Sequence, residues 1–187
     1  PHRDLLSFEE ITRVARVFVQ LGVRKLRITG GEPLLRRGLP ELIQRLHQIE
    51  GVQDLALTTN GATFRLVAHD LRAAGLDRVN ISLDTLRADR FLSMTRRDEL
   101  FRVLDGIEAA KEAGFSPVKI NAVVQRGVND DEVVDLARFG REHGVEVRFI
   151  EFMPLDADEA WDRSQVVAAR EILETVHAAF PLVGFPR

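Results

Sequence analysis

Short runs rich in β-branched residues alternate along the chain with longer stretches whose apolar residues recur at helical spacing. The strand candidates are Arg24–Thr29, Asp54–Thr59, Arg78–Asp84, Val118–Val124 and Glu146–Glu151. The helices expected after the strand candidates are Leu39–Ile49, Phe64–Ala74, Glu99–Ala113, Asp130–His143 and Ala169–Phe180. Strands and helices that alternate in this way are typical of parallel βαβ units with right-handed crossovers.

Helix ends are marked by residues with known capping roles. Ser7 and Glu10 form a capping box, which predicts a further helix that runs to Gly22 before the first strand. Left-handed caps are expected at the glycines that follow four helices, which are Gly22, Gly75, Gly114 and Gly144.

Apolar and polar residues alternate within the strand candidates, which is unusual for strands that helices cover on both faces. One face carries Leu26, Ile28, Leu55, Leu57, Val79, Ile81, Leu83, Val118, Ile120, Val147 and Phe149. The opposite face carries Arg27, Thr29, Thr58, Asn80, Ser82, Asp84, Lys119, Asn121 and Arg148. This pattern fits either an open half-sheet whose polar face meets solvent or a curled sheet with a wide, wet lumen. We favour the curled sheet, because all five strands repeat the pattern and inward cations need partners.

Three cations on the polar face indicate the chemistry of a ligand. Arg27, Lys119 and Arg148 all carry positive charge, and phosphate or carboxylate groups are the ligands that such residues bind. We therefore expect an anionic ligand, for which either triphosphate or carboxylate groups are suited.

Length and composition favour one globular domain over residues 1–187 and exclude several classes of protein. The net charge of −3 argues against a dedicated nucleic-acid binder. No stretch approaches the roughly 18 apolar residues of a membrane helix, and the first residues lack the layout of a secretory signal. We expect a cytoplasmic protein that binds neither nucleic acid nor membrane. Because the chain starts at Pro1 rather than Met, we also expect a fragment of a longer protein.

The sequence contains no cysteine, so these residues offer no disulfide, no thiolate metal site and no cysteine nucleophile. The histidines are scattered without the spacing of metal ligands. We therefore identify no metal-binding residue in the chain.

The sharpest local motif is Thr29-Gly30-Gly31-Glu32-Pro33, which directly follows the first strand candidate. Two glycines allow the backbone to approach a ligand closely, and the carboxylate of Glu32 can pair with an ammonium group. The motif also fits a plain turn from strand to helix, and its spacing alone leaves both interpretations open.

Polar clusters also mark the ends of other strand candidates. Ligands of parallel α/β folds bind at the carboxyl ends of strands, so these clusters predict a single binding rim. They are Thr58-Thr59-Asn60-Gly61, Asn80-Ile81-Ser82-Leu83-Asp84 and Glu151-Phe152-Met153-Pro154.

Taken in order, the motifs resemble those of the radical S-adenosylmethionine superfamily and, within it, the GTP 3′,8-cyclase (MoaA) family of molybdenum cofactor biosynthesis. Gly-Gly-Glu-Pro alone indicates the superfamily. The narrower family is indicated by Arg-Ile-Thr before it and by Leu-Thr-Thr-Asn-Gly, Asn-Ile-Ser-Leu-Asp, Lys-Ile-Asn and Arg-Phe-Ile-Glu-Phe-Met-Pro after it. The resemblance runs from about Leu5 to Phe180. It implies an incomplete (βα)6 TIM-like barrel of parallel strands with outer helices, whose first strand and cluster loop are missing from this chain.

The resemblance also implies an activity for the complete protein. In that family a [4Fe–4S] cluster reduces S-adenosylmethionine to a 5′-deoxyadenosyl radical, which abstracts hydrogen from the 3′ carbon of GTP. The product is (8S)-3′,8-cyclo-7,8-dihydroguanosine 5′-triphosphate. The family has two iron–sulfur clusters, and the cysteines that hold them are absent from this chain. We therefore expect the chain by itself to be inactive.

Site residues and partners are implied by the same resemblance. The S-adenosylmethionine site would include Gly30, Gly31, Glu32, Ser82 and Met153. The GTP contacts would be Arg27, Thr58, Lys119 and Arg148, and no catalytic residue is identified within the chain. The implied partners are GTP as substrate, an electron donor and cyclic pyranopterin monophosphate synthase as the enzyme that acts next. A homodimer is compatible with the resemblance.

Two other functions remain open from the residues alone. Lys119 could form a Schiff base with a carbonyl substrate, as in (βα)-barrel lyases. The chain could also belong to a non-catalytic relative that binds a nucleotide without converting it.

Overall fold

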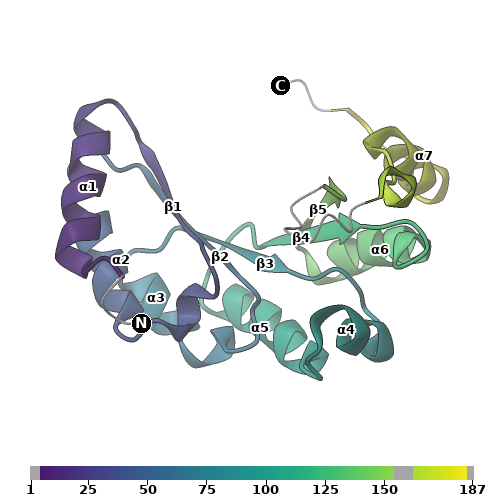
Figure 1. Cartoon of the computed structure of the whole chain (residues 1–187), viewed down its shortest axis with the longest axis horizontal. Helices are drawn as coiled ribbons and strands as arrows, with labels where there is room; N and C mark the ends of the chain where they lie inside the picture. Colours follow the sequence, from purple (N-terminus) through teal and green to yellow (C-terminus); the bar gives the residue numbers. More distant parts are fainter. Residues whose placement is uncertain (1–4, 154–161, 185–187) are drawn as a thin grey trace. The chain divides into compact units, whose positions relative to one another are not determined.

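The computed structural model describes residues 5–153 and 162–184, which Figure 1 colours from the purple α1 to the yellow α7. The chain divides into two compact units. The first contains the residues up to Ile81 together with Phe101–Val118, and the second contains Ser82–Leu100 and the residues from Lys119 onward.

The first unit is built on parallel strands. β1 (Lys25–Ile28) pairs with β2 (Asp54–Thr59), and β2 pairs with β3 (Arg78–Ser82), whose last residue belongs to the second unit. The helices are α1 (Phe8–Gln20), α2 (Leu39–His47), α3 (Ala68–Ala73) and nearly all of α5 (Leu100–Glu112). The core joins one face of the strands to the helices. Its fully buried side chains include Leu55, Leu57, Val79, Ile81, Ile43, Phe64, Leu71 and Ile107.

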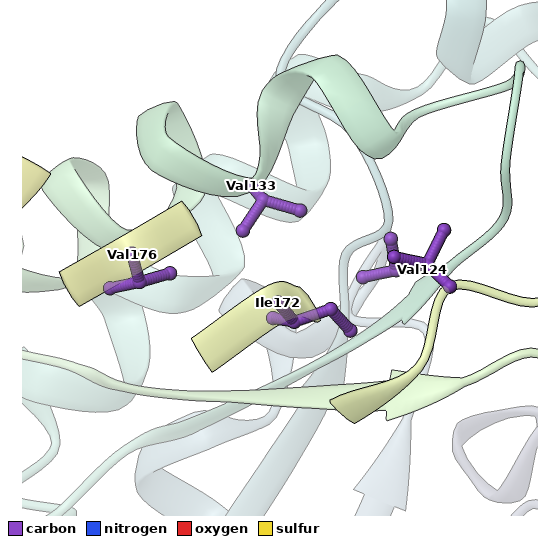
Figure 2. Close-up of a cluster of buried hydrophobic side chains, with 5 residues drawn as sticks. Val124, Val133, Ile172 and Val176 are labelled. Carbon is purple, nitrogen blue, oxygen red and sulfur yellow. The ribbon is translucent and has the colours of Figure 1, made fainter. Parts of the chain in front are cut away.

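The second unit contains β4 (Lys119–Val124) and β5 (Glu146–Glu151), which pair in parallel. Its helices are α4 (Ala88–Thr95), α6 (Val133–His143) and α7 (Ala169–Ala179). Helices α6 and α7 contact each other and β5. Figure 2 shows the buried cluster that joins these elements, with Val124 from β4, Val133 from α6, and Ile172 and Val176 from α7.

Most predicted elements are confirmed. All five strands are present, and two of them have the predicted bounds. The capping box is formed, because Ser7 N donates to Glu10 Oε2 at 2.7 Å and Glu10 N donates to Ser7 Oγ at 3.2 Å. Positive φ angles are found at all four glycines expected to cap helices, which are Gly22, Gly75, Gly114 and Gly144.

Several element predictions are wrong in part. The predicted helix Phe64–Ala74 is a 3₁₀ turn over Phe64–Leu66 followed by α3, because Val67 between them has a φ of −132°, outside the helical range. The predicted strand over residues 78–84 ends at Ser82. The predicted helix over residues 130–143 begins with a 3₁₀ turn over Asp130–Glu132. Helix α4 was not expected, although Ala88, Phe91 and Leu92 recur at helical spacing, because this spacing extends over only eight residues.

The alternation within the strands corresponds to burial in the central strands. The predicted apolar face is buried at β2, β3 and β4, whereas its residues in β1 and β5 are half-buried. The polar face is mixed, because Arg27 and Ser82 are exposed while Asn80 and Lys119 are buried. Buried polar groups need hydrogen-bond partners, so the partners of the buried residues on this face have to be identified.

Candidate functional site

The turn after β1 presents open backbone. Gly30 has a φ of +132°, a conformation that side chains disfavour. A Cβ atom built on Gly30 or Gly31 would meet no heavy atom within 4 Å. The backbone of this turn is therefore open, and its predicted contact with a ligand stays a prediction.

Glu32 ties this turn to the end of β2. Its carboxylate accepts hydrogen bonds from Thr59 Oγ1 at 2.7 Å, from Asn60 N at 2.8 Å and from Leu34 N at 3.0 Å. Both carboxylate oxygens therefore hold the chain itself in place, a role that sequence reasoning missed. The predicted contact of Glu32 with a ligand amine stays a prediction.

Two buried polar atoms on the predicted polar face have no hydrogen-bond partner. They are Thr58 Oγ1 and Asn80 Nδ2, within the part of the chain that the structure describes. Thr58 on β2 lies directly opposite Asn80 on β3, so the two side chains share one face of the sheet. Polar groups left unpaired in this way are rare, and each needs a partner such as a ligand, an ion or water, or another explanation.

Arg27 lies earlier along the strands of the same unit. It is the third residue of β1, opposite Ala56, and its side chain is exposed. Arg27 also borders a largely apolar cavity of about 390 Å³ between α1, β1 and α2. Because Ala56 comes two residues before Thr58 in β2, Arg27 lies nearer than Thr58 to the amino ends of these strands. The Gly30–Gly31 turn lies beyond the carboxyl end of β1.

In the second unit, the two predicted cations share one carboxylate. Lys119 Nζ contacts Glu146 Oε1 at 2.9 Å and Oε2 at 2.7 Å, and Arg148 Nε donates to Glu146 Oε1 at 2.9 Å. The hydrogen bond from Lys119 and then that from Arg148 hold the pKa of Glu146 below its ordinary value, against the opposing effect of burial. The structure thus brings Lys119 and Arg148 together at one carboxylate, and their contact with an anionic ligand stays a prediction.

Glu146 is a residue that sequence reasoning missed. The signal was present, because Glu146 and Arg148 are two positions apart in one strand and therefore share a face. As the first residue of the strand, Glu146 is indistinguishable in the sequence from an ordinary exposed strand end.

Ser82 and Met153 lie at the carboxyl ends of strands. Ser82 is the exposed last residue of β3, and Met153 is half exposed, two residues beyond β5. Met153 follows Arg148 by five residues, which corresponds to up to about 16 Å of extended chain. Pro154, which completes the predicted motif, lies outside the described residues.

A buried polar network fixes the segment that follows Ser82. Glu132 is 1% exposed and accepts hydrogen bonds from Thr85 Oγ1 at 2.6 Å and Leu86 N at 2.8 Å. Asn129 Nδ2 donates to the carbonyl oxygens of Asp84 and Val123 at 2.7 and 2.8 Å. Sequence reasoning missed this network, because Glu132 stands in an acidic run that resembles a solvated surface.

Burial also affects Asp84 in this segment. It raises the pKa of the Asp84 carboxyl above its ordinary value, although Val123 N donates a hydrogen bond to it at 2.8 Å. The segment between β3 and α4 is therefore tied to the end of β4 by buried polar groups.

The described residues offer little to a metal ion. No group of three or more His, Asp or Glu side chains in residues 5–153 and 162–184 has a geometry that could hold one. The thiolates of an iron–sulfur cluster are not supplied by these 187 residues, which include no cysteine. None of the described helices combines the length and apolar character that crossing a bilayer requires.

Comparison with known families gives one match over most of the chain. The model of the radical SAM superfamily matches residues 1–140.

Curated relatives are more specific. The chain is 52% identical over 181 residues to the GTP 3′,8-cyclase of Geobacter sulfurreducens, covering 97% of this chain and 55% of the relative. It is 50% identical over 182 residues to the GTP 3′,8-cyclase of Streptomyces coelicolor, covering 97% of this chain and 53% of the relative. The chain thus spans about half the length of the curated relatives that it matches. The resemblance predicted from the motifs is confirmed.

Solved structures share the fold at low sequence identity. Methylornithine synthase superposes with a TM-score of 0.72 at 17% identity, covering 94% of this chain and 53% of that structure. A radical SAM methyltransferase from Sphaerobacter thermophilus superposes with a TM-score of 0.65 at 20% identity, covering 92% of this chain and 53% of that structure. These likenesses confirm the predicted fold class, an α/β fold of parallel strands that matches a partial TIM-like barrel of the radical SAM type.

Proposed function

The chain belongs to the radical SAM superfamily, and we propose that it is the core of a GTP 3′,8-cyclase. The reaction would convert GTP to (8S)-3′,8-cyclo-7,8-dihydroguanosine 5′-triphosphate in molybdenum cofactor biosynthesis. The observation that carries this proposal is identity near 50% over almost the whole chain to relatives named for that activity.

Lys119 and Arg148 are the cations that we assign to GTP in the second unit. Both side chains reach one carboxylate, so their charges converge on a small region where phosphate oxygens can accept their hydrogen bonds. In the first unit we assign Arg27 and the unpaired Thr58 hydroxyl to the same ligand.

The residues at the ends of the strands are those that we assign to S-adenosylmethionine. Gly30 and Gly31 offer open backbone, and the Glu32 carboxylate holds that turn against β2. Ser82 and Met153 stand at the ends of β3 and β5. The open backbone of the Gly30–Gly31 turn fits a bound amino-acid-like group, and S-adenosylmethionine supplies the radical chemistry of the superfamily when it is bound. An iron–sulfur cluster does not fit the residues present, so we derive no step through one.

The Schiff-base alternative has less support. Lys119 Nζ contacts both oxygens of Glu146, as an ammonium group does, whereas attack on a carbonyl needs a neutral amine. The pairing favours the anion-binding role of Lys119.

Partners and location belong to the same proposal. GTP is the substrate, cyclic pyranopterin monophosphate synthase acts next, and an electron donor drives the reaction. We place the protein in the cytoplasm, away from nucleic acid and membranes, and consider a homodimer compatible with this role.

The test is anaerobic turnover by the protein at its natural length, with its clusters reconstituted and a reductant present. When GTP is the substrate, we expect both 5′-deoxyadenosine and an isomer of GTP to form. When ATP replaces GTP, we expect neither product. Binding of GTP without any product would instead support the non-catalytic relative. Equal formation of 5′-deoxyadenosine with ATP would contradict the assignment of GTP as the substrate.

A further inference from the structure

Glu146 contacts both cations that we assign to the triphosphate. Lys119 stands directly opposite Glu146 in the register of β4 and β5, and Arg148 follows two residues later on the same face. One carboxylate thus lies within 2.9 Å of both a primary ammonium and a guanidinium nitrogen. The same two groups are donors for phosphate oxygens, so a bound phosphate and the carboxylate would compete for the same hydrogen bonds.

Lys119 is nearly buried, so the loss of its partner carboxylate would be costly. Its side chain is 11% exposed, whereas that of Glu146 is 41% exposed. A nearly buried ammonium without a counter-ion is costly, so in the absence of ligand Lys119 depends on Glu146. Glu146 itself reaches solvent and can leave the pair at much lower cost.

We propose that Glu146 is a placeholder for the triphosphate: it neutralises Lys119 and Arg148 in the empty site and yields them to the incoming phosphate. This inference rests on the proposed function, because it takes Lys119 and Arg148 as the triphosphate contacts. Glu146 acts on the ligand through these two cations and is therefore a positioning residue. Its charge weakens the hold of the site on a polyanion, and its return to the cations favours release.

A purely structural pair makes a different prediction. Cross-strand pairs of opposite charge stabilise a sheet whether or not a ligand is bound. Loss of such a pair would lower stability equally with and without triphosphate. A placeholder instead stabilises the ligand-free protein and weakens the binding of triphosphate. Its loss should therefore lower the melting temperature without ligand and raise the affinity for triphosphate.

The experiment compares wild type with Glu146→Gln in the protein at its natural length. Glutamine keeps the shape and an acceptor oxygen but removes the charge. We expect the ligand-free variant to melt at a lower temperature, because Lys119 loses its counter-ion. We expect its dissociation constant for inorganic triphosphate to fall about tenfold, because one negative charge beside both cations is gone. Glu142→Gln on α6 makes the same change of net charge at an exposed position and should alter neither value.

Lys119→Ala separates the two proposals. If it does not weaken triphosphate binding, the location of the triphosphate, and with it the proposed function of Lys119, is wrong. If Lys119→Ala weakens binding while Glu146→Gln leaves it unchanged or weaker, only the placeholder inference is overturned. An equal gain of affinity in Glu142→Gln would also overturn it, because net charge alone would then explain the effect.

Discussion

Thr58 and Thr85 are two poorly exposed threonines whose hydroxyl groups have opposite environments. The hydroxyl of Thr58 has no partner, whereas that of Thr85 donates to the buried Glu132 at 2.6 Å and accepts from Arg87 N at 3.1 Å. A buried polar group without a partner destabilises the folded state, so Thr58 is retained at a cost that a ligand can offset.

Valine substitutions should therefore have opposite effects on stability. Thr58→Val should leave the free energy of unfolding unchanged or raise it by up to about 1 kcal/mol, because an unpaired hydroxyl is removed. Thr85→Val should lower it by about 1–3 kcal/mol, because Glu132 loses a donor in a buried site. Urea denaturation measures both values, and equal losses in the two variants would contradict the assigned environments.

Asp54 and Arg78 join the beginnings of β2 and β3 through two hydrogen bonds, and the hydrogen bonding from Arg78 holds the pKa of Asp54 below its ordinary value. A carboxyl whose pKa is depressed by folding contributes stability that is complete above its unfolded pKa and is lost as the pH falls through its folded value. The difference in unfolding free energy between wild type and Asp54→Asn should therefore be constant above about pH 5 and shrink toward about pH 3.

Urea denaturation over this pH range provides the measurement. Glu50→Gln, at an exposed position of the same unit, is the control for general effects of charge. A difference between wild type and Asp54→Asn that does not depend on pH would show that the ion pair does not stabilise the fold.

At the scale of elements, the sequence predicted what local periodicity determines. Alternation located all five strands, and the capping box located the start of α1. Helix α4 was missed because its eight residues offer only about two turns in which an apolar spacing can repeat. The break at Val67 was missed because the apolar spacing continues across it while the backbone does not.

Close packing between α5 and the turn after β2 makes a prediction at this scale. A Cβ atom on Gly106 would lie 2.5 Å from the carbonyl oxygen of Gly61. This oxygen belongs to the backbone and cannot easily move away. Gly106→Ala should lower the free energy of unfolding by about 1–3 kcal/mol through overpacking, despite the better helix propensity of alanine. Thermal unfolding measures the effect. Gly31→Ala, which meets open space, is the matched control and should retain wild-type stability.

At the scale of the whole molecule, alternation and motif order identified the candidate site better than any single residue did. The face that carries Thr58 and Asn80, and the face that carries Lys119 and Arg148, were both predicted from a period of two. Glu146, the partner of Lys119 and Arg148, was not predicted, because strand register brings it into place. Glu132, the partner of Thr85, was not predicted either, because it lies in a loop that returns to the sheet. Register and loop paths depend on contacts distant in sequence, which local patterns do not encode.

Gly31 and Lys119, which we assign to different ligands, belong to different units. Gly31 lies beyond the end of β1, while Lys119 begins β4. We expect the two positions to serve different ligands, with S-adenosylmethionine near the glycine turn and the triphosphate of GTP at the cations.

The most direct test measures the dissociation constants of GTP and S-adenosylmethionine for Lys119→Ala and Gly31→Ala in the protein at its natural length. Lys119→Ala should weaken GTP binding by about 2–5 kcal/mol, or about 30-fold or more, because a buried charge contact is removed. Its affinity for S-adenosylmethionine should stay within about twofold of wild type, since independent sites are additive. Gly31→Ala should show the reverse, because a methyl group enters the space of S-adenosylmethionine. If both variants weaken both ligands equally, or if Lys119→Ala leaves GTP binding unchanged, the assignment of these residues to two ligands is wrong.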